Sequence, residues 1–260
     1  MAGGTWMSQN KVQPGVYINT KSSGNLSANV GEKGTVAIAE PLSWGPCEVM
    51  QTIIPGEDLT PYIGYDVTNK KAMFLREMMK GSDTTPGPVK ILLYRPKGTG
   101  GVKASGTVGA LSVTALYEGV RGNDITMIVQ EDPDTEGTYV VSTVVDGQTV
   151  DEQTVTALSE LSANAWVTFS GTGNTFTETA GTALSGGTDP TVSNVDYSAF
   201  LSALEKYPFD IVVYDGTEQV VIQAYASFVK RISERIGQKC QAVMAGAHNS
   251  NTEWVISVGN

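Results

Sequence analysis

The fold of this chain is decided by residues 210–245, which read DIVVYDGTEQVVIQAYASFVKRISERIGQKCQAVMA. Residues 210–214 and 241–245 are short, mainly apolar runs that predict strands. Residues 218–236, between them, carry apolar side chains at helical spacing. A strand, a helix and a second strand in this order are typical of a βαβ unit, whose two strands lie parallel in one sheet. The fold class is therefore predicted to be α/β.

Similar elements flank this unit on both sides. Residues 196–206 predict a helix before it, and the chain stops directly after a strand-like run that begins at Val255. We therefore expect an α/β sheet core domain built from residues 28–97 and 190–260 and incomplete at its C-terminus. Its first segment is predicted to contain a strand at 35–39, a loop at 41–46, a helix at 69–80 and a strand at 89–94.

Residues 98–189 have a different composition, rich in Thr, Val, Ser and Gly. Apolar and polar residues alternate there, as in strands with one solvated face. Asp146-Gly147, between two such runs, is a strong signal for a hairpin turn. We expect an inserted small β-rich domain that faces outward and is dispensable for folding of the core. The clearest alternating runs are 111–116, 125–129, 139–145 and 167–169.

Residues 1–27 are predicted to form an extended N-terminal arm. They are polar and rich in Gly, Ser and Asn, apart from one compact apolar cluster. Pro14 favours extended geometry in the residue before it, and Val16, Tyr17 and Ile18 favour strands. With no hairpin partner nearby, this strand must pair elsewhere. The predicted inter-subunit arm is Pro14, Gly15, Val16, Tyr17 and Ile18, with a hinge at residues 21–29.

Charge and hydropathy exclude several classes of protein. A formal net charge of -10 argues against a general nucleic-acid binder or a binder of anionic membranes, because phosphate contacts need clustered Lys and Arg. No apolar run approaches the length of a membrane span, and residues 1–10 do not read as a secretion signal. The two cysteines, Cys47 and Cys240, are far apart and are interpreted as core thiols.

Catalysis finds little support in the sequence. The single histidine, His248, has no nucleophile motif to serve, and no phosphate-binding loop or zinc-protease spacing is present. Residues 132–137 resemble the start of a calcium loop, but Thr143 stands where the closing acid belongs, so a surface turn is predicted. We therefore predict no catalytic, cofactor-binding or metal-binding residues.

A basic group lies near the end of the long predicted helix. Lys230, Arg231 and Arg235 belong to it, and the four-residue spacing places Arg231 and Arg235 on one helix face. One interpretation is an ordinary solvated face. The other is an inter-subunit charge patch that meets acidic surface on an identical copy.

Several strings together resemble the contractile tail sheath family of phage tails and of phage-tail-like bacteriocins from Gram-positive bacteria. They are dispersed over nearly the whole chain, although Glu118 stands where the family commonly has Pro. The strings are PGVYIN at 14–19, the first core strand and its loop at 37–46, YEGVRGNDIT at 117–126, LSGGTD at 184–189, FVKR at 228–231 and KCQA at 239–242.

This resemblance implies a tail sheath subunit, a non-enzymatic virion structural protein that works by self-assembly into a helical polymer. Sheath subunits form stacked hexameric rings around a tail tube and contract to drive the tube through a cell envelope. The implied partners are other copies, the tail tube protein, and baseplate and tail terminator proteins, with no nucleic acid and no membrane. The implied location is a virion or a tail-like particle (a tailocin or other contractile injection system), assembled in the bacterial host cytoplasm. Family members normally continue into a C-terminal domain and arm that this sequence lacks.

Two other classes of function stay open at this point. An α/β enzyme or ligand-binding protein would place its site at the C-terminal ends of the strands. The positions to inspect for it are Asp215-Gly216 and residues 246–249. A surface adhesin would use the Thr- and Gly-rich insert, but it lacks a secretion signal.

Overall fold

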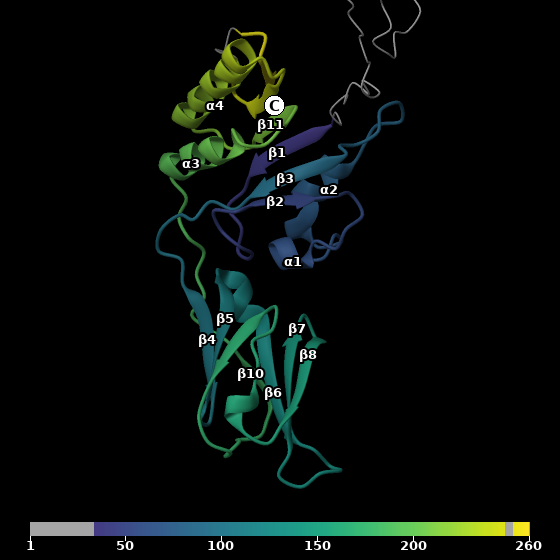
Figure 1. Cartoon of the computed structure of the whole chain (residues 1–260), viewed down its shortest axis with the longest axis vertical. Helices are drawn as coiled ribbons and strands as arrows, with labels where there is room; N and C mark the ends of the chain where they lie inside the picture. The colour runs from purple at the N-terminus through teal and green to yellow at the C-terminus, as the bar shows by residue number, and fades with distance from the viewer. Residues whose placement is uncertain (1–33, 248–251, 260) are drawn as a thin grey trace, which may run out of the picture. The chain divides into compact units, whose positions relative to one another are not determined.

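The computed structural model describes residues 34–247 and 252–259 (Figure 1). The predicted arm, Pro14 to Ile18, and the single histidine, His248, lie outside the described residues.

A six-stranded sheet forms the centre of the α/β core. Its strand order is β13-β12-β11-β1-β3-β2, and every neighbouring pair is parallel except β2 with β3. Parallel neighbours need crossover connections, and described helices lie in those between β1 and β3 and between β11 and β12. The predicted α/β class and largely parallel sheet are therefore confirmed. The strands are β1 (Thr35–Ala39), β2 (Met50–Ile53), β3 (Lys90–Tyr94), β11 (Ile211–Tyr214), β12 (Gln241–Ala245) and β13 (Val255–Val258).

Helices cover both faces of this sheet. On β1, Ala37 and Ala39 pack into the cluster formed with α3 and α4, whereas Ile38 points to the opposite cluster, which contains α1 and α2. Because side chains alternate along a strand, both faces are buried, which explains the uninterrupted apolar runs in the sequence. The helices are α1 (Thr60–Ile63), α2 (Met73–Met79) after a 3-10 turn (Lys70–Ala72), α3 (Asn194–Leu204) and α4 (Gln219–Arg231), which continues into a π-helical turn (Ile232–Ile236).

Residues 103–183 form the two antiparallel sheets of a β-sandwich, and the wider segment 98–189 that contains them is here called the insert. One sheet has the order β10-β6-β7-β8 and the other β4-β5-β9. Their inward-facing side chains make a separate hydrophobic cluster, as expected for strands that alternate apolar and polar residues. The strands are β4 (Lys103–Val108), β5 (Leu111–Glu118), β6 (Ile125–Glu131), β7 (Tyr139–Val145), β8 (Gln148–Val155), β9 (Val167–Ser170) and β10 (Thr179–Ala183).

The predicted hairpin turn joins β7 to β8. Asp146 and Gly147 both have positive φ, 52° and 77°, as a type I′ turn requires. The right-handed twist of two antiparallel strands matches this turn, so the sequence signal and the pairing of Val145 with Gln148 agree.

The chain enters and leaves the insert along a two-stranded stem. Thr99 pairs with Thr191, Val102 with Thr188, and Ser105 with Ser185, all in antiparallel bridges. The two ends of the insert therefore return to the core side by side.

Candidate functional site at the junction of core and insert

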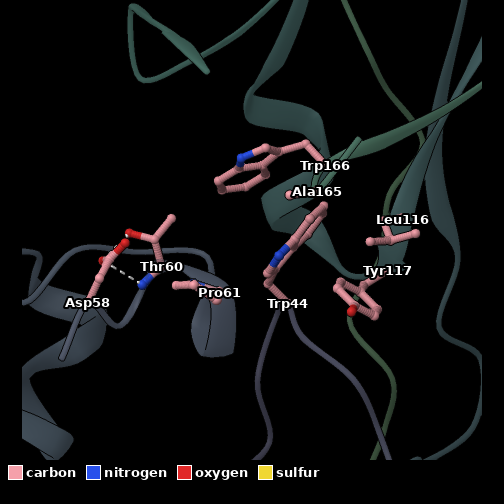
Figure 2. A pocket seen from close by; sticks show the side chains of 8 residues that line it. All are labelled: Trp44, Asp58, Thr60, Pro61, Leu116, Tyr117, Ala165 and Trp166. Atoms are coloured by element: carbon pink, nitrogen blue, oxygen red, sulfur yellow. Dashed lines mark hydrogen bonds between the residues drawn. The ribbon is translucent and has the colours of Figure 1, made fainter. Parts of the chain in front are cut away.

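Trp44 belongs to the core by sequence but to the insert by packing. It lies in the loop after β1, yet only 1% of it is exposed and it joins the hydrophobic cluster of the insert. Figure 2 shows its indole between two aromatic rings of the insert: Trp166 at 4.8 Å between centroids, and Tyr117 at 5.2 Å in an edge-to-face arrangement. Such pairs add to the stabilisation that comes from burial alone.

Arg121 makes the reverse connection, from the insert into the core. It lies on a 3-10 turn (Val120–Asp124) and is 2% exposed. Its Nε donates to the carbonyl oxygen of Gly64 in the core at 2.8 Å, and its guanidinium lies 4.2 Å from the ring centre of Tyr65. A buried charge is costly unless it is paired, and these two contacts supply part of the pairing of Arg121.

Two carboxylates of the insert neutralise Arg121. Its Nη1 and Nη2 donate to the two oxygens of Asp146 at 2.9 and 2.5 Å, and Nη1 also donates to Asp124 at 3.0 Å. Burial opposes the charged form, but the hydrogen bonds that Arg121 donates to Asp146 and Asp124 prevail and raise the pKa of Arg121. The hydrogen bond that Arg121 donates lowers the pKa of Asp146. Arg121 and Asp146 therefore both stay charged around neutral pH.

Backbone carbonyls and Asp189 complete the junction. Arg95, 2% exposed, donates to the carbonyl oxygens of Gly45 in the core loop (2.5 Å) and Glu118 at the end of β5 (2.7 Å). Asp189 accepts from the Ser43 hydroxyl at 3.0 Å and from the amide of Val120 at 2.9 Å. Loop 43–45 is therefore hydrogen-bonded to Asp189, at the end of the insert, and to Arg95, which in turn binds the Glu118 carbonyl of the insert.

Gly119 allows the two backbones to approach so closely. Its φ is 129°, and an added Cβ would lie 2.0 Å from the carbonyl oxygen of Ser43. Only glycine combines this conformation with this contact.

A cavity of about 360 Å³ lies beside these aromatic rings (Figure 2). Its only carboxylate, Asp58, accepts hydrogen bonds from the amide and hydroxyl of Thr60 at 3.0 and 2.7 Å. Most of the other lining side chains are aromatic or aliphatic, so the surface is suited to packing against an apolar group. The lining residues are Trp44, Asp58, Thr60, Pro61, Leu116, Tyr117, Ala165 and Trp166.

One of the three residues of the predicted basic patch forms an ion pair within the chain. Arg231 donates to both carboxylate oxygens of Glu205, just after α3, at 2.8 and 2.9 Å, whereas Lys230 and Arg235 are exposed. The backbone is π-helical from Ile232, so the 3.6-residue spacing that places Arg231 and Arg235 on one face does not continue through this turn. The inter-subunit role of these three residues stays a prediction.

The positions named for an enzyme site fall at the expected edge of the sheet. Asp215 directly follows β11, and Gly246 directly follows β12. Within residues 34–247 and 252–259, no three His, Cys, Asp or Glu side chains gather as metal ligands. None of the described helices is long and apolar enough to cross a membrane.

Sequence reasoning missed the junction and misplaced one cysteine. Trp44 and Arg121 were present in strings that resemble the family, but neither was predicted to be a site. Cys47 is exposed rather than a core thiol, because the loop after Pro46 turns it outward; Cys240 is buried as predicted.

Two family models match consecutive parts of the chain. Residues 99–189 match the phage tail sheath protein beta-sandwich domain, and residues 191–260 match the phage tail sheath protein central domain. Two relatives from Bacillus subtilis, phage-like element PBSX protein XkdK and uncharacterized protein YqbK, are each 34% identical over 278 residues. The alignments include 99% of this chain and 58% of each relative, so the chain spans little more than half of their length.

Solved structures agree with these matches. A sheath tail protein from Desulfitobacterium hafniense is 41% identical and superimposes with a TM-score of 0.84, covering 95% of this chain and 56% of that one. Sheath tail protein Lin1278 from Listeria innocua is 32% identical, with a TM-score of 0.74 and coverages of 88% and 51%. The fold, the order of the two matched domains and these similarities agree: the chain belongs to the phage tail sheath family.

Proposed function

We propose that this chain acts as a structural subunit of a contractile tail sheath. Copies form stacked hexameric rings around a tail tube and contract to drive the tube through a target cell envelope. The observation that carries the proposal is the pair of consecutive sheath-domain matches, which together span most of the described residues. The division into an arm (1–27), a discontinuous core (28–97 and 190–260) and an insert (98–189) is part of the proposal.

The work of such a subunit is mechanical rather than chemical. Contraction is a change from one set of contacts between copies to a more favourable set, with each copy moving as a body about the arms that link it to its neighbours. The junction supports this role, because Trp44 and Arg121 tie the insert to the core from both sides. A subunit held together in this way transmits force without changing its internal structure.

The sheet offers an edge for contacts between copies. In the part of the chain that the structure describes, β13 pairs only with β12, and its Ile256 and Val258 are 44% and 49% exposed. An unpaired edge accepts an added strand from another chain, which gains backbone hydrogen bonds and side-chain burial. The Pro14 to Ile18 segment of a neighbouring copy is our candidate for such a strand.

Charge favours contacts through the core rather than through the insert. Residues 98–189 contain twelve Asp or Glu but only two basic residues, Lys103 and Arg121. The insert therefore carries the whole formal net charge of -10, and the other residues of the chain hold equal numbers of acidic and basic side chains. Two inserts brought together repel each other, and salt screens this repulsion only beyond a Debye length of about 8 Å. Other copies, the tail tube, the baseplate and the tail terminator are therefore proposed to meet the core, where Lys230 and Arg235 are exposed.

Deleting residues 1–19 from the full-length sheath protein should abolish polymers while leaving the melting temperature of the subunit nearly unchanged. The deleted segment contributes to contacts between copies, where each backbone hydrogen bond is worth about 0.5–1.5 kcal/mol. Electron microscopy reports the polymers, and circular dichroism reports melting.

A point variant and its control sharpen this test. Tyr17→Pro removes a donor in the middle of the strand and should also prevent assembly, whereas Tyr17→Phe keeps the donor and should assemble normally. The assigned role of the arm is wrong if the deletion unfolds the subunit while the remaining folded protein still forms polymers.

A further inference from the structure

The insert and the far ends of α3 and α4 lie at opposite edges of the central sheet. The chain leaves the sheet for the insert after β3 and returns from it to the start of α3, and the loop that contacts the insert follows β1. β1 and β3 are parallel, so the insert is attached at the carboxyl edge. α3 and α4 run back to the amino edge, where β11 and β12 begin. These strands are four or five residues long, so the two edges are about 15 Å apart.

Several exposed side chains gather at the amino edge, where printed contacts hold three segments together. Arg231 at the end of α4 binds Glu205 just after α3. The Nε2 atom of Gln238 donates to the carbonyl oxygen of Phe209 at 2.7 Å, and the Phe209 ring stacks on that of Phe228 at 5.9 Å between centroids. The exposed residues of these segments, here called the amino-edge patch, are Lys206, Tyr207, Lys230, Arg235, Ile236 and Lys239.

The amino-edge patch carries a net positive charge. Within the described residues, none of its four cations forms an ion pair. Of the acids at this edge, Glu205 is paired, and Asp210 accepts hydrogen bonds from two backbone amides at 2.8 and 2.9 Å. Glu234 and Glu253 are exposed, so two available acids face four cations.

The patch also exposes apolar surface. Tyr207 and Ile236 are 39% and 55% exposed. Aromatic residues and Arg are enriched where proteins meet, and apolar side chains among charges of one sign favour a partner surface of the opposite sign. The patch therefore fits an acidic protein surface.

The end of the insert remote from the core is such a surface. β6 begins directly after the turn that holds Arg121 against the core, and it ends at Glu131, about 20 Å farther on. The ends of β8 and β10 that pair with this end of the sheet adjoin it. Both basic residues of the insert lie elsewhere, because Arg121 is buried at the junction and Lys103 adjoins the stem. The acids at the remote end are Glu131, Asp132, Asp134, Glu136, Glu160 and Glu178.

We propose that the remote acidic end of the insert of one copy docks on the amino-edge patch of a second copy. The insert does not reach the patch of its own chain, because its acidic end is remote from the core and the patch lies at the opposite edge of the sheet. Two inserts repel each other, whereas the patch attracts an insert. The inference rests on the proposed sheath function, to which it adds the two surfaces in contact.

The geometry of this contact suits a polymer. The two copies use different surfaces, one at the insert and one at the amino edge, so each copy has one surface of each kind left over. Such head-to-tail contacts continue from copy to copy, and they form a closed ring or a helical filament.

Sedimentation equilibrium of the 260-residue chain tests the contact through its dependence on charge. Raising the salt from about 50 mM to about 500 mM should lower the association constant by about fivefold or more, because salt screens exposed charges. Lys230→Glu combined with Arg235→Glu should lower it by about tenfold, and so should Asp134→Lys combined with Glu136→Lys. All four side chains are exposed, so circular dichroism should show both double variants folded as the wild type is.

A mixture of the two double variants separates docking from a general effect of charge. The reversed patch of one variant faces the reversed insert of the other, so the association constant should return to within about threefold of the wild-type value. Each double variant changes the formal net charge of -10 by four units, so both stay negative and overall attraction does not explain recovery. Lys71→Glu combined with Lys80→Glu, exposed cations before and after α2, is the matched control and should associate nearly as the wild type does.

Three results would overturn the contact: a wild type that does not associate, a mixture that stays dissociated, or a control that loses association as fully as the patch variant. The sheath function is tested separately, by deletion of residues 1–19 from the full-length protein. Polymers that depend on residues 1–19, together with a mixture that stays dissociated, would therefore leave the sheath function standing and remove only this contact.

Discussion

Replacing Trp44 by alanine should lower the free energy of unfolding by about 3–5 kcal/mol, the usual cost of removing a fully buried aromatic side chain. Only 1% of Trp44 is exposed, and its ring contacts Trp166 and Tyr117 on the opposite side of the junction. The surrounding β-sandwich is closed by paired strands and cannot collapse into the space. Much of the loss should therefore arise in the insert, although the substituted residue lies in a loop of the core.

Urea unfolding gives the magnitude, and hydrogen exchange locates the loss. Amides of β5 and β9 should exchange faster in Trp44→Ala, whereas those of β11 and β12 should keep their protection. Trp254→Ala is the control, because Trp254 is only partly buried and lies beside Lys239; it should cost less than half as much. Unchanged exchange in β5 and β9 would show that Trp44 does not support the insert.

Replacing Arg121 by alanine should cost about 2–4 kcal/mol. Breaking a fully buried ion pair typically costs about 3–5 kcal/mol, but Asp146 and Asp124 are 57% and 51% exposed and regain water when the guanidinium is removed. The loss that remains comes from the carbonyl of Gly64 and from the space left beside Tyr65. Arg121→Lys keeps the charge but not the planar set of donors, so it should recover less than half of the loss.

Arg231→Ala is the matched control for Arg121→Ala. Arg231 makes the same two-oxygen contact, with Glu205, but both side chains are 39% exposed. An exposed pair contributes about 0–1 kcal/mol, so urea unfolding should separate the two variants clearly. An equal loss of unfolding free energy in the two variants would show that burial does not increase the contribution of Arg121 to stability.

The elements that the sequence predicted are those whose signal is local. The β1 run is apolar at every position from Val36 onward because both of its faces are buried, and Asp146-Gly147 has the conformation that its residue types favour. The strands β4 and β10, by contrast, were not predicted. They consist largely of Ala, Gly, Ser and Thr, so they lack the bulky apolar side chains that mark an alternating pattern; β5 pairs with β4, and β6 pairs with β10.

The candidate site escaped prediction because it depends on contacts between residues far apart in the chain. The loop at 41–46 was predicted as a loop, but no local pattern shows that Trp44 inserts between residues 117 and 166. Likewise, Arg121 is separated by 57 residues from the carbonyl that it binds. The expectation that the insert is dispensable for folding stays a prediction, but its removal would expose Trp44 and free Arg95 from the Glu118 carbonyl.

The position of Trp44 also bears on how sheath genes could exchange their inserts. A recombination event that replaces residues 98–189 brings in every strand of a new sandwich but leaves behind one residue of the old hydrophobic core. The incoming sandwich must already possess a recess that accepts an indole at that place, together with a cation that reaches the Gly64 carbonyl. We therefore expect exchange to succeed chiefly for inserts that evolved beside a similar loop, with residues 43–45 transferred together with the insert.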